Sequence, residues 1–436
     1  MKTKKKSTDK ILVITLGCSK NTVDSEKLMR QLSANSIKLE YDKDHSDAKT
    51  VIINTCGFIN DAKKESINTI IYYAKAKQRG QIENLYVIGC LSERYANELK
   101  IEIPEVDQFF GINSIKEILN SIGYNFRDNL IGERLLITPG HFAYLKISEG
   151  CNRKCAFCAI PLIRGPYKSE KVKNIVNEAK SLAKKGVKEL MVIAQDISYY
   201  GIDLYETPML AYLINKLSEI NGIEWIRLHY AYPAGFPKDL IQVIRDNPKV
   251  CKYLDIPFQH ISDNMLKVMR RGTNKKKTLG LIKELRENIP GIALRTTILT
   301  GHPGETERDF IELVEFVQDY KFERLGIFTY SHEEGTYAAQ KYKDSISNKI
   351  KNNRAETIMS IQQSISKEIG KTRVGKEYKV IVDQKENDFF IGRTEFDSPE
   401  VDNEVLIKSA KKLKIGNFYN IKITGSNEFD LFGIPI

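Results

Sequence analysis

The sequence has few cysteines and no long apolar run. Seven cysteines among 436 residues are too few for a disulfide scaffold, and their odd number leaves at least one unpaired. No window approaches the roughly 20 apolar residues of a membrane-spanning helix. The apolar stretch that follows the lysine-rich residues 1–10 is too short for a signal peptide. We therefore expect a cytoplasmic protein without membrane contact, whose thiols stay reduced and free to bind metal.

The charge of the chain shows a mild basic excess that is unevenly placed. With 67 basic and 56 acidic residues, the formal net charge is +11. Residues 1–140 hold 21 basic and 18 acidic side chains, residues 141–370 hold 35 and 27, and residues 371–436 hold 11 of each. Such an excess suits nucleic acid or another acidic partner, although cytosolic enzymes often carry one. At 42% hydrophobic and 28% charged residues, disorder throughout the chain is excluded.

Residues 1–10 are expected to form a disordered basic tail, because polar chain ends usually fray. From residue 11 to about 135, short apolar strands alternate with helical stretches that we expect to begin at about Asp24, Asp61 and Glu93. This order predicts a parallel sheet covered by helices, and hence an amino-terminal α/β domain.

Two further segments follow. Residues 142–370 contain six more strands, most of them separated by helical stretches, which fits a partial (βα)6 barrel, and they end in a long polar helix at about 344–371. Residues 373–436 contain five short alternating strands separated by turn residues, which predicts a small antiparallel β-barrel. The expected fold class is therefore α/β, with three domains.

A compact cysteine motif opens the second of these segments. Cys151, Cys155 and Cys158 form C-x-x-x-C-x-x-C just after a predicted strand. Zinc usually needs four ligands, and no fourth Cys or His follows at a suitable spacing. In a four-iron cubane each iron needs one outside ligand, so three cysteines leave one iron open for a substrate or cofactor. Gly150 and Asn152 allow the tight turn that such a loop needs. We interpret the motif as an open-sited iron–sulfur cluster rather than a zinc site or three buried thiols.

This motif, at the start of a repeated βα unit, resembles that of the radical S-adenosylmethionine enzymes. The resemblance implies that Cys151, Cys155 and Cys158 hold a 4Fe–4S cluster whose open iron chelates S-adenosylmethionine. It also implies that one electron from the cluster cleaves a carbon–sulfur bond to give a 5′-deoxyadenosyl radical. Phe157, just before the third cysteine, would then lie near the adenine.

Three other cysteines each stand at or near the end of a predicted strand of the first segment. Cys18, Cys56 and Cys90 lie in TLGCSK, NTCGFI and VIGCLS, spaced 38 and 34 residues apart. Because parallel strands place their carboxyl ends at one edge of the sheet, we expect the three to share that edge. They predict a second three-thiolate site, where a thiophilic open iron would bind a sulfur species. The alternative is a coincidence of three strand-end cysteines.

The arrangement as a whole resembles the methylthiotransferases, and the likeness runs over nearly the whole chain. It implies an auxiliary 4Fe–4S cluster on Cys18, Cys56 and Cys90 in the amino-terminal domain, a radical S-adenosylmethionine barrel, and a TRAM domain over residues 373–436. Cys251 has no counterpart role in the family, and we interpret it as a core or surface thiol.

That family divides by substrate, and several motifs favour one group. One group modifies adenosines beside the tRNA anticodon, and the other modifies an aspartate of small-subunit ribosomal protein twelve. NTCGFI, GCLSERY, FCAIPLIRG and GRTEFDSPEVDNEV are similar to the second group. The tRNA adenosine 2-methylthiotransferase is the alternative, and a non-catalytic RNA-binding protein with structural metal sites is a more distant one.

Charge gives an independent argument about the substrate. A TRAM domain that grips RNA should be basic, because phosphate neutralisation dominates RNA affinity, whereas residues 371–436 have no net charge. An acidic strip suits a basic protein substrate better, although a solvated loop would look the same. The strip consists of Glu395, Asp397, Glu400, Asp402 and Glu404.

The resemblance also implies the reaction and its partners. One S-adenosylmethionine methylates a sulfur at the auxiliary cluster, and a second provides the radical that removes hydrogen from the aspartate β-carbon, which then takes the methylthio group. The enzyme would be a methylthiotransferase that depends on S-adenosylmethionine and a sulfur carrier. Its partners would be ribosomal protein twelve, free or in the small subunit, a sulfide source, and a one-electron donor such as a flavodoxin or ferredoxin.

No side chain beyond the cluster cysteines is assigned a catalytic role. Polar residues at the carboxyl ends of barrel strands are candidates for contacts to S-adenosylmethionine or substrate, because barrel enzymes place their chemistry there. We expect Gln195, Asp196 and Arg270, together with Phe157, to bind the cofactor. Further candidates are His229, Gln259, His260, which could equally cap a helix, Arg271, and residues 300–305.

Overall fold

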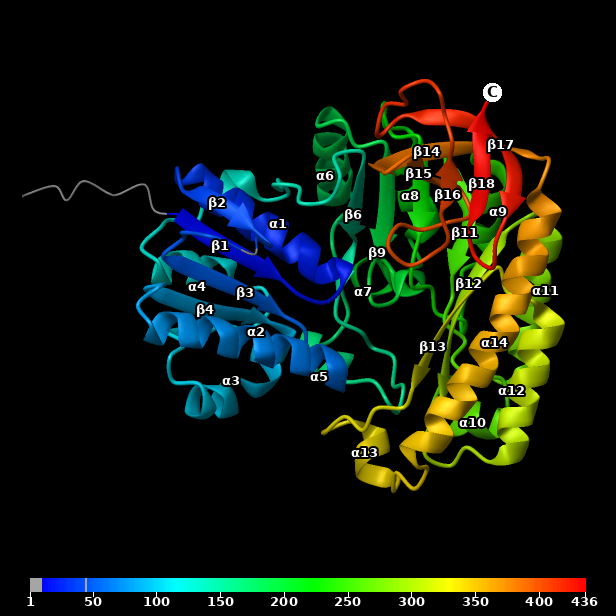
Figure 1. Ribbon diagram of the computed structural model, residues 1–436. Coiled ribbons are helices and arrows are strands. Elements are labelled where there is room, and N and C mark those ends of the chain that lie inside the picture. The colour runs from blue at the N-terminus through cyan, green and yellow to red at the C-terminus, as the bar shows by residue number, and fades with distance from the viewer. Residues whose placement is uncertain (1–9, 44) are drawn as a thin grey trace, which may run out of the picture. The chain divides into compact units, whose positions relative to one another are not determined.

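A computed structural model describes residues 10–43 and 45–436 (Figure 1). The expectation of a disordered tail at residues 1–10 therefore lies, except for its last residue, outside the described residues. The chain forms two compact units, which we call the first and the second unit. Of the described residues, the first contains 10–43, 45–137, 149–151 and 159–167, and the second contains 138–148, 152–158 and 168–436. Within the described residues, no helix is both long and apolar enough to span a membrane.

The first unit is built around a five-stranded parallel sheet in the order β2-β1-β3-β4-β5. Ile11 and Val13 of β1 pack with α1 and α4, while Leu12 and Ile14 pack on the opposite face with α2 and α3. Because both faces are buried, its central strands are continuous apolar runs. The elements are β1 (Lys10–Thr15), α1 (Ser19–Ala34), β2 (Lys38–Tyr41), β3 (Thr50–Thr55), α2 (Asn60–Gln78), β4 (Asn84–Gly89), α3 (Cys90–Glu102), β5 (Gln108–Phe109), α4 (Ile115–Ser121), η1 (Asp128–Leu130) and α5 (Ile160–Arg164).

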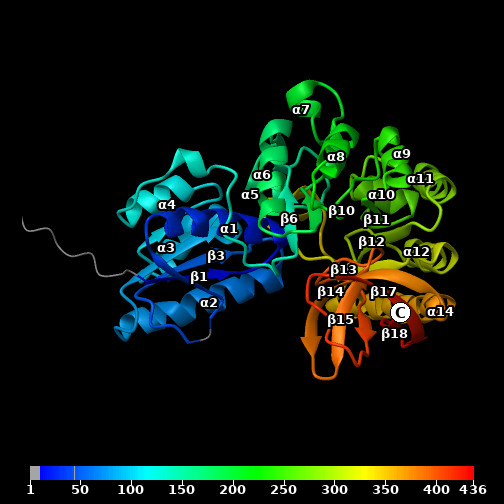
Figure 2. The same cartoon turned by 90° about the horizontal axis from the view of Figure 1, so that it is seen from above.

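The second unit contains six parallel strands in the order β13-β12-β11-β10-β9-β6, so each strand lies beside the one before it in the chain. This confirms the open, partial barrel. Figure 2 shows α9, α11 and α12 on the outer side of its strands. The strands are β6 (Phe142–Lys146), β9 (Glu189–Ile193), β10 (Trp225–Leu228), β11 (Val250–Asp255), β12 (Ala293–Thr300) and β13 (Arg324–Thr329), with the short β7 (Ser148–Glu149) and β8 (Lys168–Ser169). The helices are α6 (Val172–Lys184), η2 (Ile197–Tyr199), α7 (Ile202–Tyr205), α8 (Leu210–Ser218), α9 (Lys238–Asp246), α10 (Asp263–Val268), α11 (Lys275–Asn288), α12 (Glu307–Tyr320), α13 (Tyr337–Lys341) and α14 (Asn348–Arg373).

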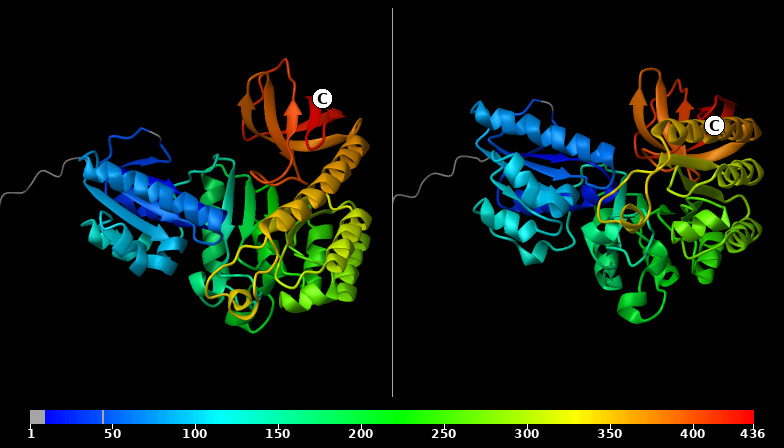
Figure 3. Two further views of the ribbon diagram at one scale, coloured as in Figure 1. Left: turned by 60° about the horizontal axis from the view of Figure 1, so that its bottom comes forward. Right: turned by 90° about the horizontal axis from the view of Figure 1, so that it is seen from below.

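A small closed barrel completes the second unit, and the long helix α14 leads into it (Figure 3). Its core is apolar, with Val380, Val405 and Ile421 fully buried. The expectation of a purely antiparallel barrel is wrong in one pairing, because β16 and β18 run parallel and together close the barrel. The strands are β14 (Glu377–Glu386), β15 (Phe389–Thr394), β16 (Val405–Ile407), β17 (Phe418–Ser426) and β18 (Leu431–Pro435).

Candidate functional site

Three cysteines of the first unit stand at the carboxyl ends of three neighbouring strands. Cys18 precedes α1 after β1, Cys56 follows β3, and Cys90 begins α3 directly after β4. Since β1, β3 and β4 are adjacent in the sheet, the prediction that these cysteines share one edge is confirmed. Gly17 shows how tightly the loops meet. It has a φ of +93°, and a Cβ there would lie 2.6 Å from the Cβ of Cys56.

The three thiols differ in exposure and interact electrostatically. Cys18 is exposed, whereas Cys56 and Cys90 are buried. Burial raises the pKa of Cys56 and raises the pKa of Cys90 to about 12, and charge on the neighbouring cysteines pushes both in the same direction. Metals bind the thiolate, which is the form that burial disfavours. A cluster at this edge would therefore have to supply the positive charge that keeps these cysteines deprotonated.

A buried arginine lies beside these thiols. The Nη2 of Arg164, on α5, donates to the Sγ of Cys90 at 3.3 Å and to the Oδ1 of Asn21 at 2.7 Å. Its Nη1 donates to Glu149 at 2.9 Å and to Asp24 at 3.3 Å. Sequence reasoning missed Arg164, although the IPLIRG stretch that carries it drew attention. Its contacts come from positions up to 143 residues away, which no local pattern reports.

The C-x-x-x-C-x-x-C motif divides between the two units. In the first unit, the amide of Cys151 donates to the carbonyl of Gly165 at 3.1 Å. Gly150, with a φ of +73°, leaves no room for a side chain, because a Cβ there would lie 2.1 Å from the carbonyl oxygen of Pro166. This supports the expectation that glycine permits the tight turn at the start of the motif.

In the second unit, Cys155 lies beside a stacked cationic and aromatic group. The Nη1 of Arg271 donates to the Sγ of Cys155 at 3.1 Å, and the Tyr232 hydroxyl lies 3.7 Å from the same sulfur. The guanidinium carbons of Arg153 and Arg271 lie 4.2 and 4.4 Å from the centre of the Tyr232 ring. The amide of Cys158 donates to the carbonyl of Cys155 at 3.2 Å, which closes the turn between them.

Each set of three thiols offers the ligand type that iron–sulfur clusters use. Among the residues that the structure describes, no three His, Cys, Asp or Glu side chains are grouped to hold one metal ion. In a cubane each thiolate binds a different iron, so its cysteines need not meet around a single ion. Cys90 also has apolar neighbours, Ala159 and Ile163, and such a surrounding shell controls the access of water to a cluster.

Comparisons with known proteins agree with this chemistry. Models of three families match the chain: an uncharacterized protein family, UPF0004, at residues 10–111, the radical SAM superfamily at 145–317, and the TRAM domain at 374–436. A "ribosomal protein uS12 methylthiotransferase RimO" of Phocaeicola vulgatus is 55% identical over 421 residues, covering 96% of this chain and 98% of its own. One of Cytophaga hutchinsonii is 51% identical over 434 residues, covering 99% of each. The chain belongs to the RimO family.

Membership makes this RimO-family chain a methylthiotransferase, and its superfamily implies a 4Fe–4S cluster and S-adenosylmethionine as cofactors. Solved structures show a likeness in fold alone. The radical S-adenosylmethionine methyltransferase TsrM of Kitasatospora setae aligns with a TM-score of 0.55 at 14% identity, over 76% of this chain and 77% of its own. The cobalamin-dependent enzyme OxsB aligns with a TM-score of 0.51 at 12% identity, over 81% and 56%.

The four residues expected to bind the cofactor have different surroundings in this RimO-family chain. Phe157 packs among apolar side chains that include Met269 and Leu299. Gln195 is half-buried just after β9. Asp196 is buried and accepts from the Nε of Arg153 at 2.7 Å and the amide of Ser198 at 2.9 Å. Arg270 is exposed and stacks on the ring of Tyr337 at 4.3 Å. Their contact with a cofactor stays a prediction.

Several further candidates have structural partners. The Nδ1 of His260 accepts from the amides of Ile261 and Ser262, at 2.9 and 3.1 Å, just before α10. Its Nε2 therefore carries the proton and donates to Glu305 at 3.2 Å. Glu305 also accepts from the amide of Gly301 at 2.8 Å. His260 thus holds the turn before α10, whereas the helix itself is capped by Ser262, which accepts from the amide of Met265 at 3.2 Å. Two other candidates also have hydrogen-bond partners. His229 bonds to the hydroxyl of Ser398, and Arg271 donates to the carbonyl of Pro257.

The interpretation of the acidic strip as a surface for a basic substrate is wrong for Asp397 and Asp402, whose side chains are buried, whereas Glu400 and Glu404 are exposed. Within the second unit, Asp397 is buried against Arg324, and the carboxylate of Asp402 accepts from the Tyr253 hydroxyl at 2.7 Å and from Arg295 at 3.2 Å. The other contacts are Glu395 with the amide of Lys252 and Glu400 with the hydroxyl of Tyr144. These carboxylates join the small barrel to the strands of the partial barrel. Cys251 is confirmed as a core thiol, 1% exposed.

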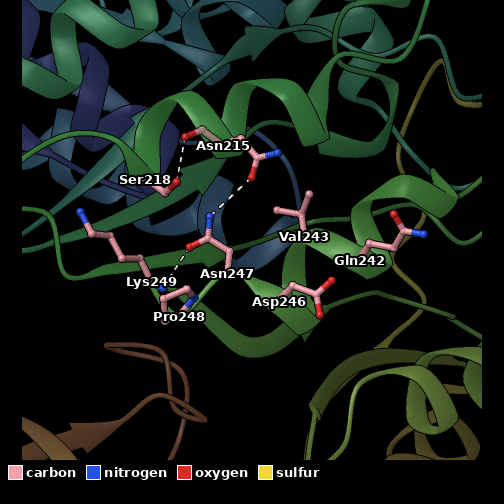
Figure 4. Close-up of a pocket in the computed structure, with 8 residues that line it drawn as sticks. All are labelled: Asn215, Ser218, Gln242, Val243, Asp246, Asn247, Pro248 and Lys249. Carbon is pink, nitrogen blue, oxygen red and sulfur yellow. Dashed lines mark hydrogen bonds between the residues drawn. The ribbon is translucent and has the colours of Figure 1, made fainter.

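Figure 4 shows a surface hollow in the second unit, lined by the ends of α8 and α9. The hydroxyl of Ser218 donates to the carbonyl of Asn215 at 2.8 Å. Asn247 donates to Asn215 at 3.5 Å and accepts from the amide of Lys249 at 3.1 Å. None of the cysteines lines it, so we do not include it in the candidate site.

Proposed function

We propose that this protein transfers a methylthio group to the β-carbon of an aspartate of small-subunit ribosomal protein uS12. The observation that carries the proposal is the set of relatives named for that activity, at 50 to 55% identity over at least 96% of the chain. The convergence of Cys18, Cys56 and Cys90 at one sheet edge supports a site for the sulfur chemistry.

The proposal assigns one cluster to each set of cysteines. Cys151, Cys155 and Cys158 bind the cluster that holds S-adenosylmethionine, and Cys18, Cys56 and Cys90 bind the auxiliary cluster. When bound, these groups supply the one-electron chemistry and the methylthio sulfur by which an unactivated C–H bond becomes a C–S bond. The auxiliary domain then comprises residues 11–135, the radical domain 142–370 and the TRAM domain 373–436.

The side chains around Cys155 orient this part of the site. Arg271 bridges the sulfur of Cys155 and the carbonyl of Pro257, with donor–acceptor distances of 3.1 and 2.6 Å. Asp196 already accepts from Arg153 and Ser198, so its role is to hold Arg153 against Tyr232. Phe157 provides an apolar surface for the adenine, while Gln195 and Arg270 supply polar contacts. This arrangement positions the cofactor and excludes water.

The reaction also needs partners outside the chain. We assign it a one-electron donor such as a flavodoxin or ferredoxin, a sulfide source, and uS12 either free or in the small subunit. All of these are available in the cytoplasm, where we place the enzyme.

Deleting the gene tests the substrate. We expect uS12 from the deletion strain to lack the mass of a methylthio group that replaces one hydrogen, and the full-length protein to restore it. Intact-protein and peptide mass spectrometry of ribosomes measures this. If the modification disappears instead from tRNA nucleosides of the same strain, the enzyme acts on adenosine and the uS12 proposal is wrong.

Iron content tests the number of clusters. After anaerobic reconstitution with iron and sulfide, two cubanes predict about eight irons per chain, and Cys18→Ala should retain about four. Cys251→Ala is the matched control, because this thiol lies in the apolar core and should leave iron content unchanged. Fewer than about six irons in the unchanged protein would exclude two complete clusters.

A further inference from the structure

Arg164 is a buried cation in contact with a thiol of the first unit. It is 5% exposed, and the Nη2 end of its guanidinium faces the sulfur of Cys90 and the amide oxygen of Asn21. Asn21 in turn donates to the carbonyls of Leu16 and Thr55, at 2.8 and 3.0 Å. Those two residues lie within two positions of Cys18 and Cys56. The guanidinium is therefore connected to all three cysteine loops of the first unit, once directly and twice through Asn21.

The opposite end of the same guanidinium binds carboxylates. Nη1 donates to Asp24 on α1 and to Glu149, two residues before Cys151. Gly165, the next residue after Arg164, accepts the amide of Cys151. Within the first unit, one short segment thus positions both the start of the radical motif and the edge that carries Cys90.

Simple electrostatics give the consequence for a cluster on these thiols. Its reduction adds one electron and no proton, so the cluster becomes more negative by one charge. A buried cation and a hydrogen bond to a ligating sulfur both stabilise the more negative state, and these are recognised determinants of cluster potential. In the weakly screened interior of a protein, a unit charge that contacts a ligating sulfur strongly affects the reduction potential of the cluster.

We propose that Arg164 is a positioning residue of the auxiliary cluster, which orients Cys90 through its Nη2–Sγ contact and raises the cluster's reduction potential through its charge. This inference rests on the proposed assignment of Cys18, Cys56 and Cys90 as ligands. Asp24 and Glu149 act against it, because both carboxylates offset part of the guanidinium charge.

The test uses full-length protein in which Cys151, Cys155 and Cys158 are replaced by alanine, so that any remaining cluster is the auxiliary one. Dithionite supplies the electron, and an electron paramagnetic resonance titration gives the potential. We expect Arg164→Gln to lower the equilibrium constant for reduction about tenfold, which is about 59 mV for one electron. Arg164→Lys keeps the charge and should give a smaller shift. Asp24→Asn should shift the potential upward.

Arg30→Gln is the matched control, because Arg30 lies on the same helix as Asp24 but pairs with Glu133 at 2.8 Å. It should leave the potential unchanged. If the background protein binds no cluster, the ligand assignment itself fails. If the cluster forms and Arg164→Gln leaves its potential unchanged, the role of Arg164 is refuted. If Arg164→Gln loses the cluster altogether, the reduction potentials of Arg164→Lys and Asp24→Asn are compared instead. A lower potential in Arg164→Lys with a higher one in Asp24→Asn supports the proposal, and shifts of the same sign in both overturn it.

Discussion

In the Cys18→Ala variant, methylthio transfer to uS12 should fall by more than about 100-fold, while reductive cleavage of S-adenosylmethionine should continue. Loss of a residue that only orients a metal ligand typically costs 10 to 100-fold, so loss of a ligand should cost more. Cleavage continues because Cys18 belongs to a different set of thiols from Cys151, Cys155 and Cys158. Chromatography of 5′-deoxyadenosine measures the cleavage, and mass spectrometry of uS12 measures the transfer.

The reciprocal variant, Cys155→Ala, should lose both activities, because methylthio transfer depends on the radical step. Cys251→Ala should keep both, since this thiol is buried beside Trp225 and Tyr253, in a part of the core that contains no other cysteine. Equal loss of cleavage and transfer in Cys18→Ala would contradict separate roles for the two sets. Retention of transfer in Cys18→Ala would exclude Cys18 as a ligand.

The placement of Cys18, Cys56 and Cys90 could be predicted because it follows from topology alone. Once β1, β3 and β4 are recognised as parallel strands, their carboxyl ends must meet at one edge. The short strands β2 and β5 were missing from the prediction, because KLEY and QF carry no apolar run of strand length. Helices α1 and α3 begin several residues before their expected acidic starts, since α1 follows β1 after three residues and α3 begins directly after β4.

The acidic strip shows why charge patterns alone mislead. A run of carboxylates looks the same in sequence whether its cations are in a partner or in the same fold. The available signal was the arginines inside apolar strands, at Arg295 and Arg324. A charged side chain in a buried strand must have a buried partner, so these positions indicated where the carboxylates of the small barrel would go.

The buried ion network beneath the small barrel should make Arg393 one of the most sensitive positions in the second unit. Arg393, on β15, donates from Nη2 to Glu189 at 2.8 Å and from Nε to Asp383 at 2.7 Å, and Glu189 is fully buried. Arg393→Ala leaves these carboxylates short of a cation, which for a broken buried pair costs about 3–5 kcal/mol of unfolding free energy. Lys379→Ala is the control, because its exposed pair with Glu224 should cost less than about 1 kcal/mol.

The pH dependence separates this electrostatic cause from a simple loss of packing. Burial alone would raise the pKa of Glu189, but Arg393 and Arg227 outweigh it and hold that pKa below its usual value. The intact network therefore stabilises the protein above the carboxyl pKa of the unfolded chain and loses this contribution as pH falls. Without Arg393 the pKa of Glu189 should rise. The deficit of the variant, which is its loss of unfolding free energy relative to the unchanged protein in urea denaturation, should therefore shrink from pH 7 to pH 5. A deficit that stays constant over this range would instead assign the loss to the packing of the Arg393 side chain.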